Sequence, residues 1–256
     1  SHIQTVKEGN WVPIHEIPCN DEVASLLSSF NSMIAIQTKM RDDLIESEKL
    51  KQQLSLSLLQ QQVNPHFLYN TLDNICALAE LDEKETLIQL VMNLSSFYRS
   101  SLSNGKMHIS IGQELEISRA YLEILQIRYF HKFDFTITCP EALKNYSCIK
   151  LLLQPILENS IYHGIKGLDR HGILHIEAED TGDCIRFTIS DNGRGFSKED
   201  YEKIWQEDAD HFGIKSIQQR ILLYYGPGYG LSMQSPQTGG CITMITLPKQ
   251  EGLPCH

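Results

Sequence analysis

The sequence predicts an α+β protein in which a helical hairpin precedes a sandwich of helices on one mixed sheet. Two observations support this fold class. Apolar residues recur at helical spacing through most of the chain up to Tyr129. From Phe133 onward, short segments that alternate apolar and polar residues are interspersed with helical runs. Strands and helices mixed in this way are typical of a single sheet covered by helices.

The first part of the chain predicts two long helical runs. Asn20 and Asp21 offer an N-terminal cap, and the following apolar residues keep helical spacing to Ile34. A second run, from about residue 42 to residue 62, contains no glycine or proline. A partial seven-residue seam connects Met33, Met40, Leu44, Leu54 and Leu58. This seam favours a two-stranded coiled coil, and a single helix lying on its own domain is the alternative.

Pro65 interrupts the helical pattern and predicts a kink, because proline removes a backbone hydrogen bond and clashes with the preceding turn. A helical stripe resumes at Phe67, Asp82 and Glu83 mark a turn, and a further helix runs to about Ser103. Two helices joined by a short turn form a hairpin. We expect two copies of this hairpin to form a four-helix bundle in a homodimer.

The second part predicts a helix at residues 113–129 and a series of strands and helices. The predicted strands are 133–138, 173–178, 185–190 and 242–247, and the later helices are 149–165 and 214–225. We expect three domains: a short segment at 1–40, a signalling helix and dimerisation hairpin at 41–110, and an α/β domain at 111–256. The second boundary falls near residue 105, or near 130 if the helix at 113–129 belongs to the bundle.

The composition argues against several classes of protein. The 256 residues carry a formal charge of −10, so we expect no nucleic-acid partner. The seven cysteines form no CxxC pair, which argues against a disulfide framework or zinc site and favours a reducing cytoplasm. No apolar stretch is long enough to span a bilayer. Because the chain starts at Ser1 rather than Met, we expect a fragment of a longer protein.

The helical segment Leu157–Gly164 carries the first candidate chemistry. Asn159 and His163 are four residues apart and share a helical face, with Glu158 beside it. An Asn carbonyl oxygen suits Mg²⁺, whose other ligands are commonly waters and nucleotide phosphates. Taken alone, the pattern is more typical of a polar helix face in water.

The segment Asp191-Asn192-Gly193-Arg194-Gly195 directly follows a predicted strand. A carboxylate at a strand end can accept a hydrogen bond from the exocyclic amine of adenine, and the glycines let backbone pass close to a ligand ring. Taken alone, this sequence is more typical of a common turn. Gly213 opens a predicted helix, whose N-terminal N–H groups attract phosphate.

Together, these segments resemble the ATP-binding domain shared by histidine kinases, gyrase, Hsp90 and MutL, over about residues 130–248. Residues 239–248 look like the closing strand of that GHKL-type fold. The resemblance implies ATP and Mg²⁺ as cofactors, with Asn159 as a metal ligand. The implied ATP-binding residues are Asn159, His163, Asp191, Gly193, Gly195 and Gly213.

The segment QVNPHFLYNTL at residues 62–72 resembles the phosphoacceptor box of the LytS/YesM-like sensor histidine kinases. The resemblance implies that His66 accepts the γ-phosphoryl group of ATP and passes it to an Asp of a response-regulator receiver domain. Taken alone, a histidine after a proline is more typical of a packing residue. Residues 3–40 further resemble the end of a HAMP relay domain whose first helix is mostly missing. This resemblance implies a fragment from the cytoplasmic side of a membrane receptor, with its anchor and sensor domain upstream.

The base that activates His66 is not obvious from the sequence. Many histidine kinases place an acidic residue directly after the phosphoacceptor, but Phe67 occupies that position here. Glu158 is the candidate base, brought close by the ATP-binding domain. Asn70 lies one helical turn beyond His66 on the same face. Two roles follow for its side chain: it orients a water for dephosphorylation, or it only caps a hydrogen bond.

Three departures from the resemblance predict a modest affinity for ATP. The second glycine box has one glycine, Gly213, and the lid before it is short and acidic, with Glu207, Asp208 and Asp210. Cys241 stands where the closing strand often has a threonine. Two alternatives follow: an ATP-binding conformational relay without kinase activity, and an ATP-driven clamp like gyrase or Hsp90. The clamp leaves the box around His66 unexplained.

Overall fold

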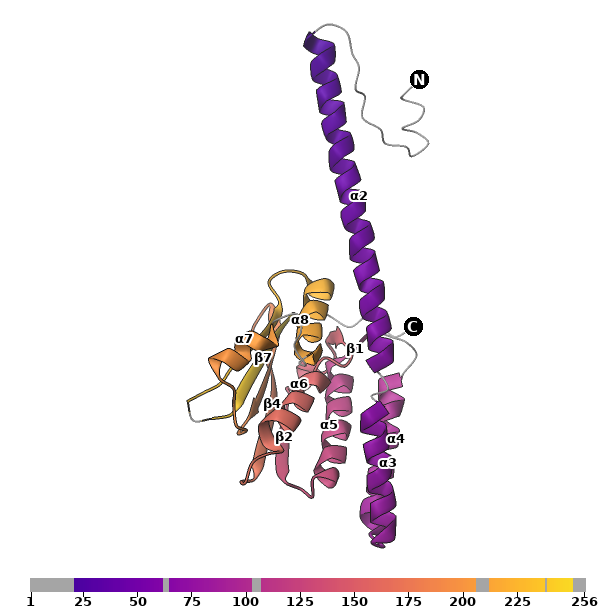
Figure 1. Cartoon of the computed structure of the whole chain (residues 1–256), viewed down its shortest axis with the longest axis vertical. Coiled ribbons are helices and arrows are strands. Elements are labelled where there is room, and N and C mark those ends of the chain that lie inside the picture. The colour runs from indigo at the N-terminus through magenta and orange to yellow at the C-terminus, as the bar shows by residue number, and fades with distance from the viewer. Residues whose placement is uncertain (1–20, 62–64, 103–106, 206–211, 238, 251–256) are drawn as a thin grey trace. The chain divides into compact units, whose positions relative to one another are not determined.

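A computed structural model describes residues 21–61, 65–102, 107–205, 212–237 and 239–250, and it contains two compact units. The first unit is residues 1–61 and the second is residues 62–256. Among the described residues, no helix has both the length and the apolar character that crossing a membrane requires. Figure 1 shows the second unit as a helical hairpin beside a sandwich of helices and strands.

The described part of the first unit is one helix, α2 (Asp21–Gln61). The two helical runs predicted from the sequence are therefore continuous, because the range contains no glycine or proline to break them. Met33, Met40 and Leu44 are exposed on α2. The coiled coil stays a prediction. Residues 3–20 of the HAMP-like segment and the side chains of Leu54 and Leu58 lie outside the described residues.

The predicted hairpin is confirmed as α3 (Pro65–Glu80) and α4 (Lys84–Leu102). Pro65 is the first residue of α3, a position that tolerates proline because its missing N–H has no partner within the helix. The turn between the helices contains Asp82 in a left-handed conformation, with φ of 59°. The predicted kink before Pro65 involves residues 62–64, which lie outside the described residues.

An aromatic cluster joins the hairpin to α5 (Ile111–Arg128). The ring of Phe67 lies 5.4 Å from that of Phe97 on α4 and 5.1 Å from that of Tyr121 on α5, and all three side chains are buried. Ser110 and Gln113 form a reciprocal capping box at the start of α5. Because Phe67 follows His66 directly, this packing fixes where the candidate phosphoacceptor lies.

A five-stranded sheet forms the centre of the second unit, in the order β2-β4-β5-β7-β6. The strands β2 and β4 are parallel and the other pairs are antiparallel, so the predicted mixed sheet is confirmed. The strands are β2 (Phe133–Thr138), β4 (Gly172–Asp180), β5 (Cys184–Asp191), β6 (Gly230–Gln234) and β7 (Cys241–Pro248). In β4, β5 and β7 buried residues alternate with more exposed ones, as expected for a sheet covered on one face.

Several short elements of the structure were not predicted from the sequence. These are β1 (His108–Ser110), β3 (Ser147–Ile149), the strand β6, the 3-10 turn η2 (Glu141–Leu143) and α7 (Lys198–Ile204). They are too short for a periodic pattern to identify. The last helix, α8 (Phe212–Tyr225), agrees with its prediction.

The prediction of one helix over 149–165 was wrong at its start. Ile149 belongs to β3, Leu151 is left-handed with φ of 55°, and the helix begins only with α6 (Gln154–Asn159). It continues as a π-helical turn, η3 (Ser160–Ile165). Single π-helical turns are frequent at functional sites.

Two buried charged side chains hold the segment 150–153 that precedes α6. Glu114 on α5 accepts the backbone N–H groups of Leu151 and Leu153 at 2.8 and 2.9 Å. Arg220 on α8 donates to the carbonyl oxygens of Lys150 and Leu151. The side chains of Glu114 and Arg220 are almost completely inaccessible to solvent. This arrangement, named here the Glu114–Arg220 clamp, keeps 150–153 out of the helix and sets where α6 begins.

We predict that Glu114→Ala strongly destabilises the second unit. The substitution leaves two buried N–H groups without their acceptor and removes the negative charge near the buried Arg220 guanidinium, which costs about 3 kcal/mol or more of unfolding free energy. Urea unfolding measures the change. Glu116→Ala, at an exposed position on the same helix, is the matched control and changes stability by about 0.5 kcal/mol or less. Equal effects from the two substitutions would contradict the clamp.

Candidate functional site

The helix formed by α6 and η3 presents two sets of side chains to two cavities. Asn159 and His163 line both cavities, whereas Glu158 and Tyr162 line only the larger one. Each pair is spaced by four residues, as the helical repeat requires. The helix therefore connects the two cavities, with Asn159 and His163 between them.

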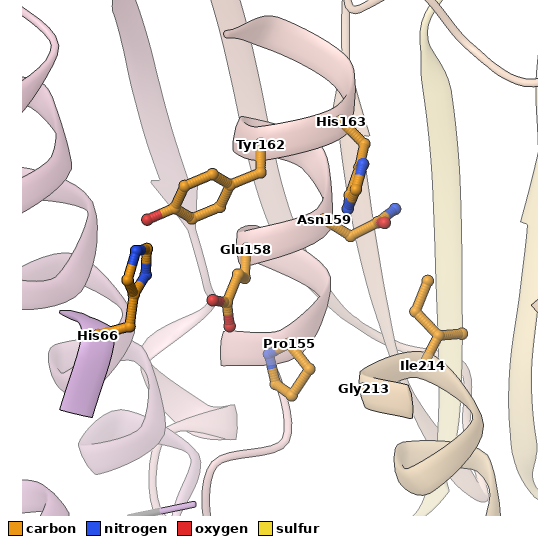
Figure 2. A pocket seen from close by; sticks show the side chains of 8 residues that line it. All are labelled: His66, Pro155, Glu158, Asn159, Tyr162, His163, Gly213 and Ile214. Carbon is orange, nitrogen blue, oxygen red and sulfur yellow. The ribbon is translucent and has the colours of Figure 1, made fainter. Parts of the chain in front are cut away.

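The larger cavity, of about 360 Å³, lies between α3, the α6–η3 helix and the start of α8. Its lining residues are His66, Pro155, Glu158, Asn159, Tyr162, His163, Gly213 and Ile214. Figure 2 shows the His66 ring on one side of this cavity and the α6–η3 helix on the other. The structure thus brings together His66, Glu158, Asn159, His163 and Gly213, which the sequence analysis had taken from three separate motifs.

His66 lies exposed in the first turn of α3, and its ring is held from one side. The side-chain nitrogen of Asn70, Nδ2, lies 3.1 Å from His66 Nδ1. An amide nitrogen only donates, so this pairing makes Nδ1 the acceptor and leaves the ring proton on Nε2. The predicted hydrogen bond from Asn70 is therefore present, with a consequence for the tautomer of His66.

Glu158 extends toward the same space from α6. Burial raises the pKa of its carboxyl group above the ordinary value. Figure 2 shows the carboxylate on the side of the helix that faces His66. A carboxylate with a raised pKa binds a proton more readily than an exposed one, which suits a general base.

The smaller cavity, of about 80 Å³, lies where the ends of β5 and β7 meet η3 and α7. Asp191 is the last residue of β5 and pairs in register with Cys241, the first residue of β7. The remaining lining residues are Asn159, Ser160, His163, Gly164, Arg194, Gly195, Phe196, Asp200 and Ile204. The predicted residues Asn159, His163, Asp191 and Gly195 therefore lie together.

The two carboxylate oxygens of Asp191 differ in their hydrogen bonds. Oδ1 accepts the N–H groups of Gly193 at 2.9 Å and Cys241 at 3.3 Å. Oδ2 is buried and has no described hydrogen-bond partner in the structure, although the Ser160 hydroxyl lies near the carboxylate. Burial raises the pKa of Asp191, and the nearby Ser160 hydroxyl and the N–H groups of Gly193 and Cys241 oppose that rise. An available acceptor oxygen in a small cavity fits the expected adenine amine.

Packing requires a glycine at position 193 and backbone conformation favours one at position 195, and neither requirement was predicted from the sequence. Gly193 lines neither cavity; a side chain there would collide with the Asp191 carboxylate and the backbone of Gly164. Gly195 has φ of +71° and lies against Gly240. The expected close passage of a ligand ring is therefore supported for Gly195, which lines the smaller cavity, and not for Gly193.

The donor set of the larger cavity fits Mg²⁺ held mainly by a nucleotide. Among the described residues, no group of three or more His, Cys, Asp or Glu side chains could hold a metal ion. Asn159, between the two cavities, offers one neutral amide oxygen. A Mg²⁺ ion that keeps waters and phosphate oxygens needs only one or two such protein ligands.

Two of the departures noted in the sequence concern this region. Cys241 lines the smaller cavity and donates its N–H to Asp191, so its backbone supports the carboxylate. Burial raises the pKa of its thiol to about 11, which keeps it protonated at neutral pH. The acidic lid residues Glu207, Asp208 and Asp210 lie outside the described residues, so the expected modest ATP affinity stays a prediction.

Sequence reasoning missed Tyr162 among the residues that line the cavity of His66. Its side chain extends toward His66 in Figure 2. Its spacing of four residues from Glu158 was a usable signal, because both side chains had to share a face. Pro155 and Ile214 line the cavity without any comparable sequence signal.

Comparison with known proteins places two family profiles on the chain. Residues 54–133 match the family described as histidine kinase. Residues 146–251 match the family described as histidine kinase-, DNA gyrase B-, and HSP90-like ATPase. The two matches cover the hairpin with α5 and the sheet domain.

Individual relatives match most of the chain. It is 30% identical over 228 residues to the sensor histidine kinase YesM of Bacillus subtilis, covering 89% of this chain and 39% of that protein. It is 31% identical over 211 residues to the sensor histidine kinase BtsS of Escherichia coli, covering 82% and 35%. The chain thus spans less than two fifths of these relatives. Among solved structures, histidine kinase ThkA in complex with response regulator protein TrrA is similar with a TM-score of 0.46 and 15% identity, covering 81% of this chain and 66% of that one.

Proposed function

The chain belongs to the LytS/YesM-type sensor histidine kinases, and on this basis we propose that it uses Mg-ATP to phosphorylate its own His66. The observation that carries this proposal is the cavity that His66 shares with Glu158, Asn159 and Gly213. A phosphoacceptor and an ATP-binding helix that line one cavity meet the main requirement of phosphoryl transfer, which is positioning.

In the proposed binding mode, adenine occupies the smaller cavity and the phosphates extend into the larger one. Asp191 accepts the exocyclic amine of adenine through Oδ2. Gly213, near the N-terminus of the 14-residue helix α8, offers backbone N–H groups to the phosphates. Asn159 contributes an oxygen to Mg²⁺, which would neutralise phosphate charge.

The proposed reaction is an in-line displacement. Nε2 of His66 attacks the γ-phosphorus, and a nitrogen–phosphorus bond forms. The bond from the γ-phosphorus to its bridging oxygen breaks, and ADP leaves with the electron pair. Since the contact with Asn70 keeps the ring proton on Nε2, a base must remove it, and we assign this role to Glu158. The other role predicted for Asn70, orienting a water that dephosphorylates His66, is separate from this reaction.

Family membership also supports a partner for the phosphorylated protein. We propose that the phosphoryl group passes from His66 to an Asp of a response-regulator receiver domain. A conformational relay without kinase activity is less well supported, because it assigns no role to the shared cavity. An ATP-driven clamp is disfavoured by the histidine kinase match at residues 54–133, which contains His66.

The hairpin carries an apolar surface that we assign to a second copy of this chain. One side of α3 and α4 packs on α5 through Phe67 and Phe97. Other apolar side chains remain exposed: Tyr69, Leu72, Leu81, Ile88, Val91 and Met92. A hairpin that leaves so much apolar surface exposed is typical of half of a four-helix bundle.

We predict that the chain sediments as a dimer at micromolar concentration and that Val91→Asp shifts it toward monomer. The substitution would place a charge in the centre of the proposed bundle, where it has no partner. Asp73→Ala, at an exposed polar position on the hairpin, is the control and leaves the dimer intact. A monomeric wild-type chain would count against the assembly.

We predict that His66→Gln abolishes autophosphorylation and keeps nucleotide affinity, whereas Asp191→Asn reduces affinity itself. Glutamine has no nucleophilic imidazole, and His66 lies outside the smaller cavity. Asn at position 191 loses the charge-assisted hydrogen bond, which is worth about tenfold or more in affinity. Phosphohistidine is measured as protein-bound label from γ-labelled ATP that is lost in acid and retained in alkali. Nucleotide affinity is measured by titration with a fluorescent nucleotide.

The two variants also identify where the proposal fails. Phosphohistidine that persists in His66→Gln would move the acceptor to another histidine. Unchanged nucleotide affinity in Asp191→Asn would mean that adenine binds elsewhere. Free phosphate without phosphohistidine in the wild-type chain would favour the clamp.

We predict that the need for Glu158 depends on Asn70. Glu158→Gln lowers the autophosphorylation rate by about a hundredfold, the usual range for loss of a general base. Asp in place of Asn70 can accept a hydrogen bond from Nδ1–H, which would move the ring proton off Nε2. In an Asn70→Asp background, Glu158→Gln should therefore cost about tenfold or less. An equal cost in both backgrounds would remove Glu158 as the base.

A further inference from the structure

Tyr162 lies on the side of the α6–η3 helix that faces the phosphoacceptor. It lines the larger cavity with His66 and Glu158, and it does not line the smaller cavity assigned to adenine. Figure 2 shows its ring directed toward His66, with the hydroxyl at the near end. Its hydroxyl is therefore placed for the transferred group rather than for the nucleotide base.

Arg128, the last residue of α5, holds this hydroxyl. Its Nη1 lies 3.0 Å from the Tyr162 oxygen. An arginine side chain only donates hydrogen bonds, so the tyrosine oxygen is the acceptor and its own hydrogen is left for another acceptor. The guanidinium also lies over the Tyr162 ring, 6.0 Å from its centre. These two contacts orient the ring and direct the hydroxyl hydrogen away from Arg128.

Two cations lie at the Tyr162 side chain, and the Glu158 carboxylate lines the same cavity. The Lys166 ammonium lies 5.6 Å from the centre of the Tyr162 ring, so two cations flank this side chain in a chain of net charge −10. A donor supported by nearby cations binds best to a charged oxygen. The γ-phosphoryl group, which on the proposed function must pass through this cavity to reach His66, carries such oxygens.

The ring contacts of Tyr162 do not by themselves require a hydroxyl. Tyr129 packs edge-on against Tyr162, with ring centres 6.2 Å apart, and it also lies beneath Arg128 and Lys166. Tyr129 does not line the cavity of His66. The Tyr129 hydroxyl lies near that of Tyr162 but has no hydrogen-bond partner among the described residues. A phenylalanine at either position would keep the aromatic packing and remove one hydroxyl.

We propose that Tyr162, anchored by Arg128, is a catalytic residue that donates its hydroxyl hydrogen to an oxygen of the γ-phosphoryl group as this group moves from ATP to His66. The tyrosine forms and breaks no covalent bond; the hydrogen bond holds the phosphoryl group in line between ADP and Nε2. The inference rests on the proposed function and adds a residue to it.

The test compares Tyr162→Phe with Tyr129→Phe. We expect Tyr162→Phe to lower the maximal autophosphorylation rate by about tenfold to a hundredfold, the value of a hydrogen bond to a charged group. The Kd for ATP should stay within about twofold, because a phosphoryl contact made in the transition state need not stabilise bound ATP. Tyr129→Phe should keep both quantities, and Arg128→Gln should reproduce part of the loss in rate. Thermal unfolding checks that the variants are folded.

A second nucleotide identifies the acceptor of the hydrogen bond. Sulfur accepts hydrogen bonds weakly, so transfer from ATPγS already lacks part of this contact. Tyr162→Phe should therefore slow transfer from ATPγS less than transfer from ATP.

The failure of this inference is distinct from failure of the proposed function. A wild-type rate in Tyr162→Phe, or a loss of ATP affinity in place of rate, would overturn the role of Tyr162 while His66 remained the acceptor. Phosphate on a residue other than His66 in the wild-type chain would instead overturn the function on which the inference rests.

Discussion

The geometry of the site depends on the Glu114–Arg220 clamp. Four backbone groups of residues 150–153 are bound from opposite sides, by a carboxylate on α5 and a guanidinium on α8. Taking two charged side chains out of water is costly, and these hydrogen bonds repay much of that cost because they satisfy buried backbone groups. The clamp sets the first residue of α6, and each residue of displacement would rotate Glu158, Asn159 and Tyr162 by about 100° around the helix. A polar interaction with no contact to either cavity thus determines which side chains enter them.

The α6–η3 helix divides the proposed chemistry between two surfaces. Asn159 and His163 line both cavities, while Glu158 and Tyr162 line only the larger one, which contains His66. A nucleotide that extends from one cavity to the other would therefore pass from residues that bind to residues that react. The two sets of side chains are separated by helical geometry alone, because residues four apart share one face of the helix. Any rotation of the helix about its axis would therefore change which side chains line each cavity.

His66, the proposed phosphoacceptor, is positioned by packing, and the proposed mechanism assigns its activation to polar contacts. Phe67 occupies the place where many histidine kinases carry an acidic residue, and it packs against Phe97 and Tyr121. The position next to His66 therefore fixes the helix against α5. In the proposed mechanism, the polar functions fall to Asn70 on the same helix and to Glu158 and Tyr162 across the cavity. Anchoring and proton transfer are thus separate tasks here, and they fall to different residues.

The fold class, the hairpin and four of the five strands of the main sheet could be predicted from the sequence, and so could a set of residues that line the two cavities: His66, Glu158, Asn159, His163, Asp191, Gly195 and Gly213. These features are local: helical and strand periodicities, a proline, and short motifs each lie within about a dozen residues. The sequence could not determine that Glu114 and Arg220 delay the start of α6, because their partners lie 37 to 70 residues away. It could not explain Gly193 either, whose crowding comes from Gly164 and Asp191. Only the tertiary structure brings His66, Tyr162 and Arg128 together, since contacts between distant segments arise when helices pack and leave no periodic signal in the chain.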